Sequence, residues 1–216
     1  MSGTALLFLA DGRFPDGTHA HSFGLEAAVA AGRVWDVDSL AEYVTCRLWT
    51  VGRTDAAAAR MAVSSHVNPD ALDAAWCIRT PSATARATSR ALGRALARTA
   101  ARLAPDRTIA LSDGSPAVQP VAFGMLAAAI GCDPDETALA SAHGTAATLS
   151  AAGLRLLSLD PFDVSVVLHN LRAAIEGVAT STIGLGAAED LPHASTPFAE
   201  IDVEAQFALS SRLFRS

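Results

Sequence analysis

Alanine and leucine carry most of the apolar character of this 216-residue chain, and this feature limits its fold more than any other. Hydrophobic residues make up 50% of the sequence, whereas Phe, Trp and Tyr together make up only 6%. Ala and Leu are strong helix formers, while sheets favour β-branched and aromatic residues. No segment alternates apolar and polar side chains with the period of two that a half-buried strand shows. Composition and pattern together predict an all-α fold.

Gly, Pro, Asp and Asn signals divide the sequence into segments of helical length. Asn68-Pro69, Asp133-Pro134 and Asp160-Pro161 each predict a helix start, because Asp and Asn cap helices and Pro is favoured in the first turn. We expect a single domain, residues 1–216, of roughly eight to ten helices, with a short N-terminal segment and a C-terminal docking tail. The expected helices cover residues 19–31, 40–51, 55–65, 69–78, 82–103, 121–130, 134–157, 160–183 and 198–214.

The net charge of −6 and the sequence pI of about 5.4 disfavour a general affinity for nucleic acids or anionic membranes. The N-terminus lacks the basic region of a signal peptide, and its apolar stretch is too short to span a membrane. The three cysteines, Cys46, Cys77 and Cys132, are scattered and form no CxxC pair. This usage suits a reducing compartment, so a cytoplasmic location is expected.

A stripe of like charge marks the expected helix over residues 82–103. Its members recur every fourth residue: Arg86, Arg90, Arg94, Arg98 and Arg102. Like charges at this spacing repel one another on a helix, so something is expected to compensate them. The stripe has three interpretations: a solvated face whose stems cover apolar surface, a surface for an acidic partner, and a nucleic-acid interface. The acidic overall charge and the absence of interleaved aromatic residues speak against the third.

His19 and His21 are the only paired metal-ligand candidates, and they are weak ones. On a helix, residues i and i+2 face opposite ways and could not share a metal. The sequence contains no GxSxG elbow, HExxH motif, P-loop or dinucleotide fingerprint. The residue types alone therefore predict a helical binding module. A metal-dependent hydrolase that uses His19 and His21, and a nucleic-acid regulator that uses the Arg stripe, remain as alternatives.

Four segments, in order, resemble the UreF family of urease accessory proteins. The opening is the most specific: residues 6–26 read LLFLADGRFPDGTHAHSFGLE, with Pro15, Gly17, Ser22 and Gly24 at the family's Pro-x-Gly and Ser-x-Gly positions. The other segments are Arg86–Arg94, similar to Arg-x-x-Ser-x-x-x-Gly; Pro120–Gly124, similar to Pro-Val-x-Phe-Gly; and Arg212–Ser216, similar to Arg-Leu-Phe-x-Ser.

The chain departs from the family pattern at four places. Thr18 stands where many relatives have a second Gly, and Gln119 stands where they tend to have His. Residues 158–161 read SLDP in place of Pro-Leu-Gly-Gln, and Gln206-Phe207 replaces a common His-Glu pair. These changes bear on partner contacts and weaken the case for a His-based nickel site.

The resemblance implies an all-α homodimer that is not an enzyme and has no intrinsic cofactor, with nickel passing only transiently. It implies assembly with the accessory protein UreD (also called UreH), the nickel-carrying GTPase UreG and apo-urease. The family's Gly-Leu-Glu acid corresponds to Glu26, and its basic residue near the end of the long helix corresponds to Arg155. Both are implicated in communication with the GTPase. If they pair with each other they form a structural bridge, and if they face outward separately they contact the partner.

The C-terminal pentapeptide has the character of a short anchor, because it places an apolar Leu-Phe pair between two arginines. Buried aromatic residues and Arg are common interface hot spots. We therefore expect partner interfaces at the tail, at Glu26 and Arg155, and at part of the stripe. The tail residues are Arg212, Leu213, Phe214, Arg215 and Ser216, and those of the stripe are Arg86, Arg90 and Arg94.

Overall fold

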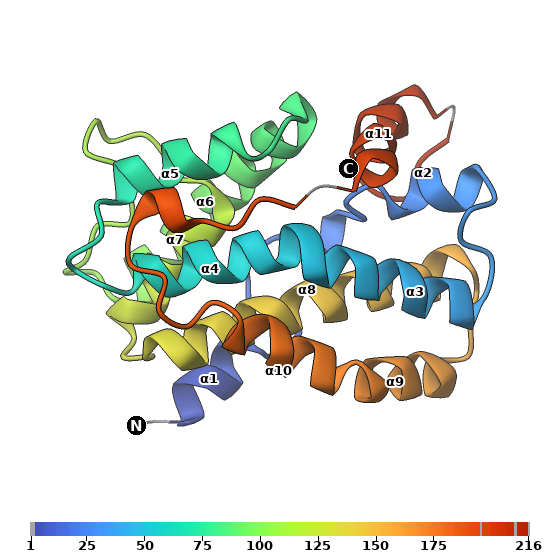
Figure 1. The fold of residues 1–216 in the computed structure, drawn as a ribbon, viewed down its shortest axis with the longest axis horizontal. Coiled ribbons are helices and arrows are strands. Elements are labelled where there is room, and N and C mark those ends of the chain that lie inside the picture. Colours follow the sequence, from blue (N-terminus) through green and yellow to red (C-terminus); the bar gives the residue numbers. More distant parts are fainter. Residues whose placement is uncertain (1–2, 195, 210, 216) are drawn as a thin grey trace.

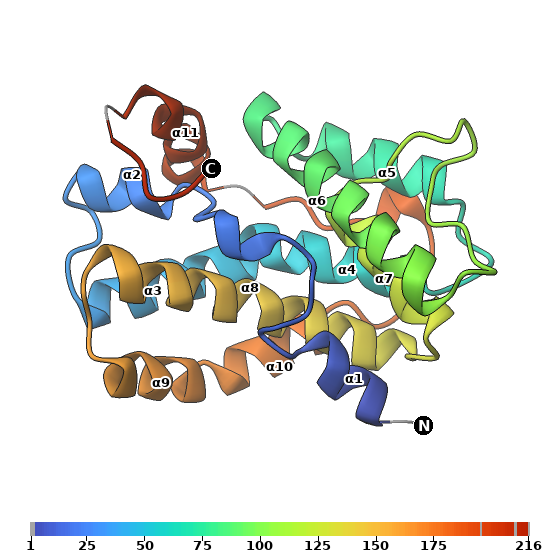
Figure 2. The same ribbon diagram turned by 180° about the vertical axis from the view of Figure 1, so that it is seen from behind.

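A long helix, α8 (Pro134–Leu156), lies at the centre of the fold (Figures 1 and 2). Along it runs a second long helix made of α3 (Val37–Arg47), a π-helical turn (Leu48–Gly52) and α4 (Arg53–Ala62) without interruption. The computed structural model describes residues 3–194, 196–209 and 211–215. None of these residues is in a β-strand, which confirms the predicted all-α class.

The remaining helices cover this central pair on several sides (Figures 1 and 2). One group packs on α4, directly or through α7, one continues from α8 and returns along it, and in a short pair a helix from the N-terminal part of the chain packs on one from the C-terminal part. The first group is α5 (Pro69–Ile78), α6 (Ala83–Leu103) and α7 (Gln119–Ala129). The second group is α9 (Pro161–Asn170) and α10 (Arg172–Thr180). The short pair is α2 (Leu25–Ala30) and α11 (Pro197–Ala205). A further short helix, α1 (Gly3–Leu9), packs on α8.

Side-chain caps explain why most helices begin where the sequence predicts. Asp133 accepts a hydrogen bond from the Glu136 amide at 2.8 Å, and the Glu136 carboxylate accepts one from the Asp133 amide at 3.1 Å. This reciprocal capping box starts α8. Asn68, Ser82 and Asp160 cap α5, α6 and α9 in the predicted positions. The cap of α3 is Asp36, which forms a capping box with Ser39, so this helix begins at Val37 and not at the expected residue 40.

The two helices expected over 40–51 and 55–65 form one continuous rod, and three other helices differ clearly from the prediction. The helix expected over 19–31 begins only at Leu25, because Phe23 and Gly24 have positive φ angles of 51° and 91°. The helix expected over 160–183 divides at Leu171 into α9 and α10. The last helix ends at Ala205, followed by a 3₁₀ turn (Gln206–Ala208) and an extended tail. The expectation of roughly eight to ten helices is met when α3–α4 and α9–α10 are each counted as one continuous rod.

Glycines allow the closest helix contacts. A Cβ atom at Gly124 would overlap the carbonyl oxygen of Ala59, so this glycine lets α7 lie against α4. A Cβ atom at Gly93 would overlap the carbonyl oxygen of Ala117, where the chain enters α7. Both positions belong to segments that the sequence singled out, and their role here is packing.

Two clusters of buried apolar side chains form the core. One lies among α4, α5, α6 and α7 and includes Leu72, Leu96 and Leu126. The other lies among α2, α3, α8, α9 and α10 and includes Leu25, Leu40 and Phe214. Among the described residues, no helix has both the length and the apolar character required to cross a membrane.

Candidate functional site

The C-terminal segment is fastened to the opening motif by Gln206. This side chain has no exposed surface. Its Oε1 atom accepts hydrogen bonds from Ser22 Oγ at 3.0 Å and from the Gly24 amide at 3.2 Å. A Cβ atom at Gly24 would lie 3.0 Å from the Val203 amide nitrogen, which explains the glycine at this contact with α11. Ser22 and Gly24 therefore lie where the opening motif contacts the C-terminal segment.

Glu26 completes this network from the first turn of α2. Its carboxylate is buried, with the residue 8% exposed. It accepts hydrogen bonds from Gln206 Nε2 at 3.0 Å, from the Leu213 amide at 2.5 Å and from the Phe214 amide at 3.1 Å. Three donors satisfy a buried carboxylate in place of a paired cation. Glu26 thus anchors the backbone of the tail, and its proposed contact with a partner remains a prediction.

Arg155 reaches the same tail from the last turn of α8. Its guanidinium carbon lies 4.6 Å from the centroid of the Phe214 ring, and its Nη2 donates to the His19 carbonyl at 3.3 Å. Phe214 itself is 4% exposed and belongs to the core. Glu26 and Arg155 therefore meet at Phe214 without pairing with each other, an arrangement that neither sequence-based alternative described.

The outer face of the C-terminal segment is apolar and uncovered. Four large side chains there are exposed by 53% to 72%: Phe198, Ile201, Phe207 and Leu213. Arg212 covers the Phe207 ring, with its guanidinium carbon 5.0 Å from the ring centroid. The tail thus has an inward-facing Phe214 and outward-facing Arg212, Leu213 and Arg215. Ser216, the last predicted interface residue, lies outside the described residues.

The other two structural motif residues, Pro15 and Gly17, place the first loop on α6. Thr99 Oγ1 donates to the Pro15 carbonyl at 3.0 Å. Gly17 has a φ angle of 86°, and a Cβ atom there would lie 3.3 Å from Leu92 Cδ2. A side chain at Gly17 would therefore be strained as well as crowded.

The Arg stripe divides into an inner and an outer part. Arg90 forms a bidentate pair with the buried Asp73 of α5, with both N–O distances 2.5 Å. Arg86 donates to the carbonyls of Thr80 and Pro81. Arg94, Arg98 and Arg102 are exposed. Asp73 thus compensates the charge of Arg90. The exposed Arg94, Arg98 and Arg102 are the part of the stripe that a partner could contact.

His19 and His21 do not form a metal site in the structure. The described part of the chain contains no group of three or more His, Cys, Asp or Glu side chains placed to hold a metal ion. His19 Nε2 contacts the Gly12 carbonyl. Burial lowers the pKa of His21, and the positive charge of Arg215 lowers it further.

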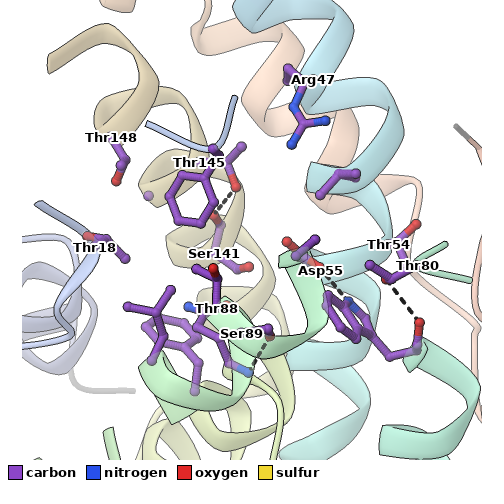
Figure 3. A pocket seen from close by; sticks show the side chains of 18 of the residues that line it. Thr18, Arg47, Thr54, Asp55, Thr80, Thr88, Ser89, Ser141, Thr145 and Thr148 are labelled. Atoms are coloured by element: carbon purple, nitrogen blue, oxygen red, sulfur yellow. Dashed lines mark hydrogen bonds between the residues drawn. The ribbon is translucent and has the colours of Figure 1, made fainter. Parts of the chain in front are cut away.

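A cavity of about 150 Å³, lined by apolar and polar side chains, lies between α4, α6 and α8, and no sequence motif pointed to it. Figure 3 shows Arg47 and Asp55 on one side, Ser141, Thr145 and Thr148 on α8, and Thr88 and Ser89 on α6. Asp55 Oδ1 accepts a hydrogen bond from Trp76 Nε1 at 2.6 Å, and burial raises the pKa of Asp55 to about 6. Arg47 and Asp55 belong to two separate expected helices, 40–51 and 55–65, so the sequence did not predict that they line one cavity.

Comparisons with known proteins agree on one family. The family model named UreF matches residues 34–172. A urease accessory protein UreF from Mycolicibacterium vanbaalenii is 38% identical over 215 residues, covering 98% of this chain and 97% of that protein. One from Mycobacterium sp. strain JLS is 35% identical and covers 94% and 92%, and one from Mycobacterium tuberculosis strain H37Rv is 37% identical and covers 86% and 88%.

Proposed function

The chain belongs to the UreF family of urease accessory proteins, and from this premise we propose that it is a non-catalytic scaffold in urease maturation. In this role it links the GTPase UreG and the accessory protein UreD/UreH to apo-urease so that nickel can be inserted. It acts in the cytoplasm as a homodimer, takes no part in membrane or nucleic-acid binding, and has no cofactor of its own. Nickel passes through the assembly only transiently.

The observation that carries the proposal is the extent of the family match. Proteins named urease accessory protein UreF align with 86% to 98% of this chain at 35% to 38% identity. A match of this extent covers the opening motif, the long central helix and the C-terminal segment together. The function of the whole protein, and not that of a shared module, is therefore the appropriate inference.

The exposed face of the C-terminal segment is the surface that we assign to UreD/UreH. Phe198, Ile201, Phe207 and Leu213 all belong to the C-terminal segment and are all largely exposed. Exposed apolar side chains gathered on one face commonly mark a protein interface. Arg212 beside Phe207 adds the Arg–aromatic combination that is frequent in interface hot spots.

Glu26 and Arg155 serve communication with UreG indirectly in this proposal. Each holds the tail from inside, since Glu26 binds the backbone of residues 213 and 214 and Arg155 covers Phe214. A change in either residue would alter how the tail presents its outer face. The exposed Arg94, Arg98 and Arg102 offer a second, electrostatic surface for an acidic partner.

Co-purification from cells that express the urease gene cluster tests this assignment. Tagged chain is expected to retain UreD/UreH and UreG. The exchange of Phe198 and Ile201 for Ser is expected to release UreD/UreH, whereas the exchange of the even more exposed Ile78, on α5, for Ser should leave it bound. Equal recovery of UreD/UreH with both variants would show that the C-terminal face is not its docking surface.

A further inference from the structure

Arg47 is a buried cation that has no partner within the described part of the chain. The residue is only 6% exposed, yet its guanidinium makes no hydrogen bond or ion pair with any residue that the structure describes. Its head lines the central cavity. Figure 3 shows it pointing from the end of α3 into the space that faces α8. Buried charges in proteins are normally paired or bind a ligand.

Local structure directs Arg47 toward this space. It is the last residue of α3 and directly precedes the π-helical turn Leu48–Gly52. Such turns often occur at functional sites, because they re-aim side chains in an otherwise regular helix. The close approach of this turn to α8 requires Gly52, where a Cβ atom would lie 3.2 Å from the Arg47 carbonyl oxygen and 3.4 Å from Thr145 Cγ2.

A row of three hydroxyl side chains on α8 forms part of the cavity lining that faces Arg47. Ser141, Thr145 and Thr148 lie at spacings of four and three residues on α8, which places them on one face of the helix. Thr145 Oγ1 donates to the Ser141 carbonyl at 3.2 Å. Gly144 lies on the same face and also lines the cavity, and a Cβ atom there would meet nothing within 4 Å. The cavity is therefore open beside this row of hydroxyls.

The charged neighbours leave Arg47 uncompensated. Asp202 is paired with Arg33, and Asp55 is hydrogen-bonded to Trp76. Both acids feel the positive charge of Arg47 at longer range, as does the buried phenol of Tyr43. Neither acid forms an ion pair with Arg47 in the described structure. Arg47 thus faces the hydroxyl row of α8, and the carboxylates that also line the cavity, those of Asp16, Asp55 and Glu200, form no ion pair with it among the described residues.

We propose that this cavity binds a small oxyanion, held by the guanidinium of Arg47 and by hydroxyl groups of α8. A planar guanidinium donates two parallel hydrogen bonds to the oxygens of one anion, and Ser and Thr hydroxyls supply further donors. One water needs roughly 10–15 Å³, so 150 Å³ admits an ion of four or five heavy atoms. Phosphate and bicarbonate share this chemistry. The inference goes beyond the scaffold role and does not depend on it.

Calorimetric titration of the purified chain tests the site. Sodium phosphate and sodium bicarbonate are titrated separately at constant ionic strength, with sodium chloride as the reference. Saturable binding of at least one of the two is expected, and the tighter binder identifies the anion. Arg47→Gln should weaken it at least tenfold, Arg47→Lys should weaken it less, and Arg94→Gln, which changes an exposed arginine, should leave it unchanged.

Filling the cavity provides a second test that keeps Arg47 in place. Gly144→Leu adds a side chain in open space on a helix, so it should preserve folding but abolish anion binding, whereas Gly144→Ala should retain most of it. In chloride buffer Arg47→Gln should melt at or above the wild-type temperature, because a buried unpaired charge is removed. Absence of saturable binding to the wild type, undiminished binding to Arg47→Gln, or undiminished binding to Gly144→Leu would overturn the proposal.

Discussion

Arg155 lies over the ring of Phe214, with its guanidinium carbon 4.6 Å from the ring centroid. The two residues are 59 positions apart in sequence, one at the end of the central helix and the other in the tail. The carboxylate of Glu26 accepts a hydrogen bond from the backbone amide of Phe214. The opening motif, the central helix and the C-terminus therefore converge at one buried aromatic residue.

Glu26→Gln is expected to destabilise the fold, because a Gln amide cannot serve the three donors that the carboxylate serves. Hydrogen bonds to charged groups contribute about 1.5–3 kcal/mol each, and the loss of charge-assisted bonding should cost about 1–3 kcal/mol in all. Thermal unfolding measures this cost, with the exposed Glu42→Gln as the matched control. An unchanged melting temperature would instead match the sequence-based expectation that Glu26 acts only on a partner.

The two apolar residues of the tail should have separable roles. Phe214→Ala removes a core side chain, so it should cost about 3–5 kcal/mol and lower the melting temperature by several degrees. Leu213→Ala changes a residue that is 61% exposed, so stability should stay within about 0.5 kcal/mol while UreD/UreH recovery falls. Circular dichroism melts and co-purification of the same two variants measure both effects. Similar destabilisation by both variants would contradict this division of the tail.

Arg90 and Arg94 should also differ, although they are neighbours in one stripe. Arg90→Gln leaves the buried Asp73 without its ion-pair partner and should cost about 1–3 kcal/mol, allowing for the partial exposure of Arg90. Arg94→Gln should leave unfolding unchanged. Reversal of Arg94 and Arg98 to Glu should weaken partner assembly most at low salt. If Arg90→Gln melted like Arg94→Gln, the pair with Asp73 would contribute little to stability.

Asp55 should give the protein a pH dependence of stability with a defined sign. Burial raises the pKa of Asp55 to about 6 in the folded state, above the ordinary value of 3.8, so the folded state binds the proton more tightly than the unfolded state. Stability should therefore fall as pH rises from about 4 to about 6, by up to about 3 kcal/mol. Asp55→Asn should remove this dependence and raise stability at pH 7, since Asn still accepts the bond from Trp76. Urea unfolding between pH 4 and pH 8 measures it, and an equally steep profile in the variant would exclude Asp55 as its source.

The sequence predicted most of the fold because the helix signals are local. The caps at Asn68, Ser82 and Asp133 start helices where expected. The late start of α2 was not predictable in the same way, because Gly24 is left-handed to admit α11, which is nearly 180 residues away in sequence. The π-helical turn after Arg47 likewise depends on packing against α8 and leaves no local signature.

The candidate site was only partly accessible from sequence. The motif residues and the tail were identified, but the hydrogen bonds that join them pass through Gln206, which stood out only as a departure from the family pattern. Charge suggested that Glu26 and Arg155 are either exposed or paired with each other. Backbone amides of the tail bind the carboxylate of Glu26, and the ring of Phe214 lies under the guanidinium of Arg155. Neither contact can be recognised before the position of the tail in the fold is known.

The role in urease maturation is tested by the nickel content of urease purified from cells that lack this chain. We expect urease that is expressed and assembled but holds little nickel and little activity, with both restored when the wild-type chain is supplied again. A chain with Phe198 and Ile201 exchanged for Ser should fail to restore them, whereas the Ile78→Ser control should succeed. Urease with full nickel content and activity in the absence of the chain would contradict its role in urease maturation.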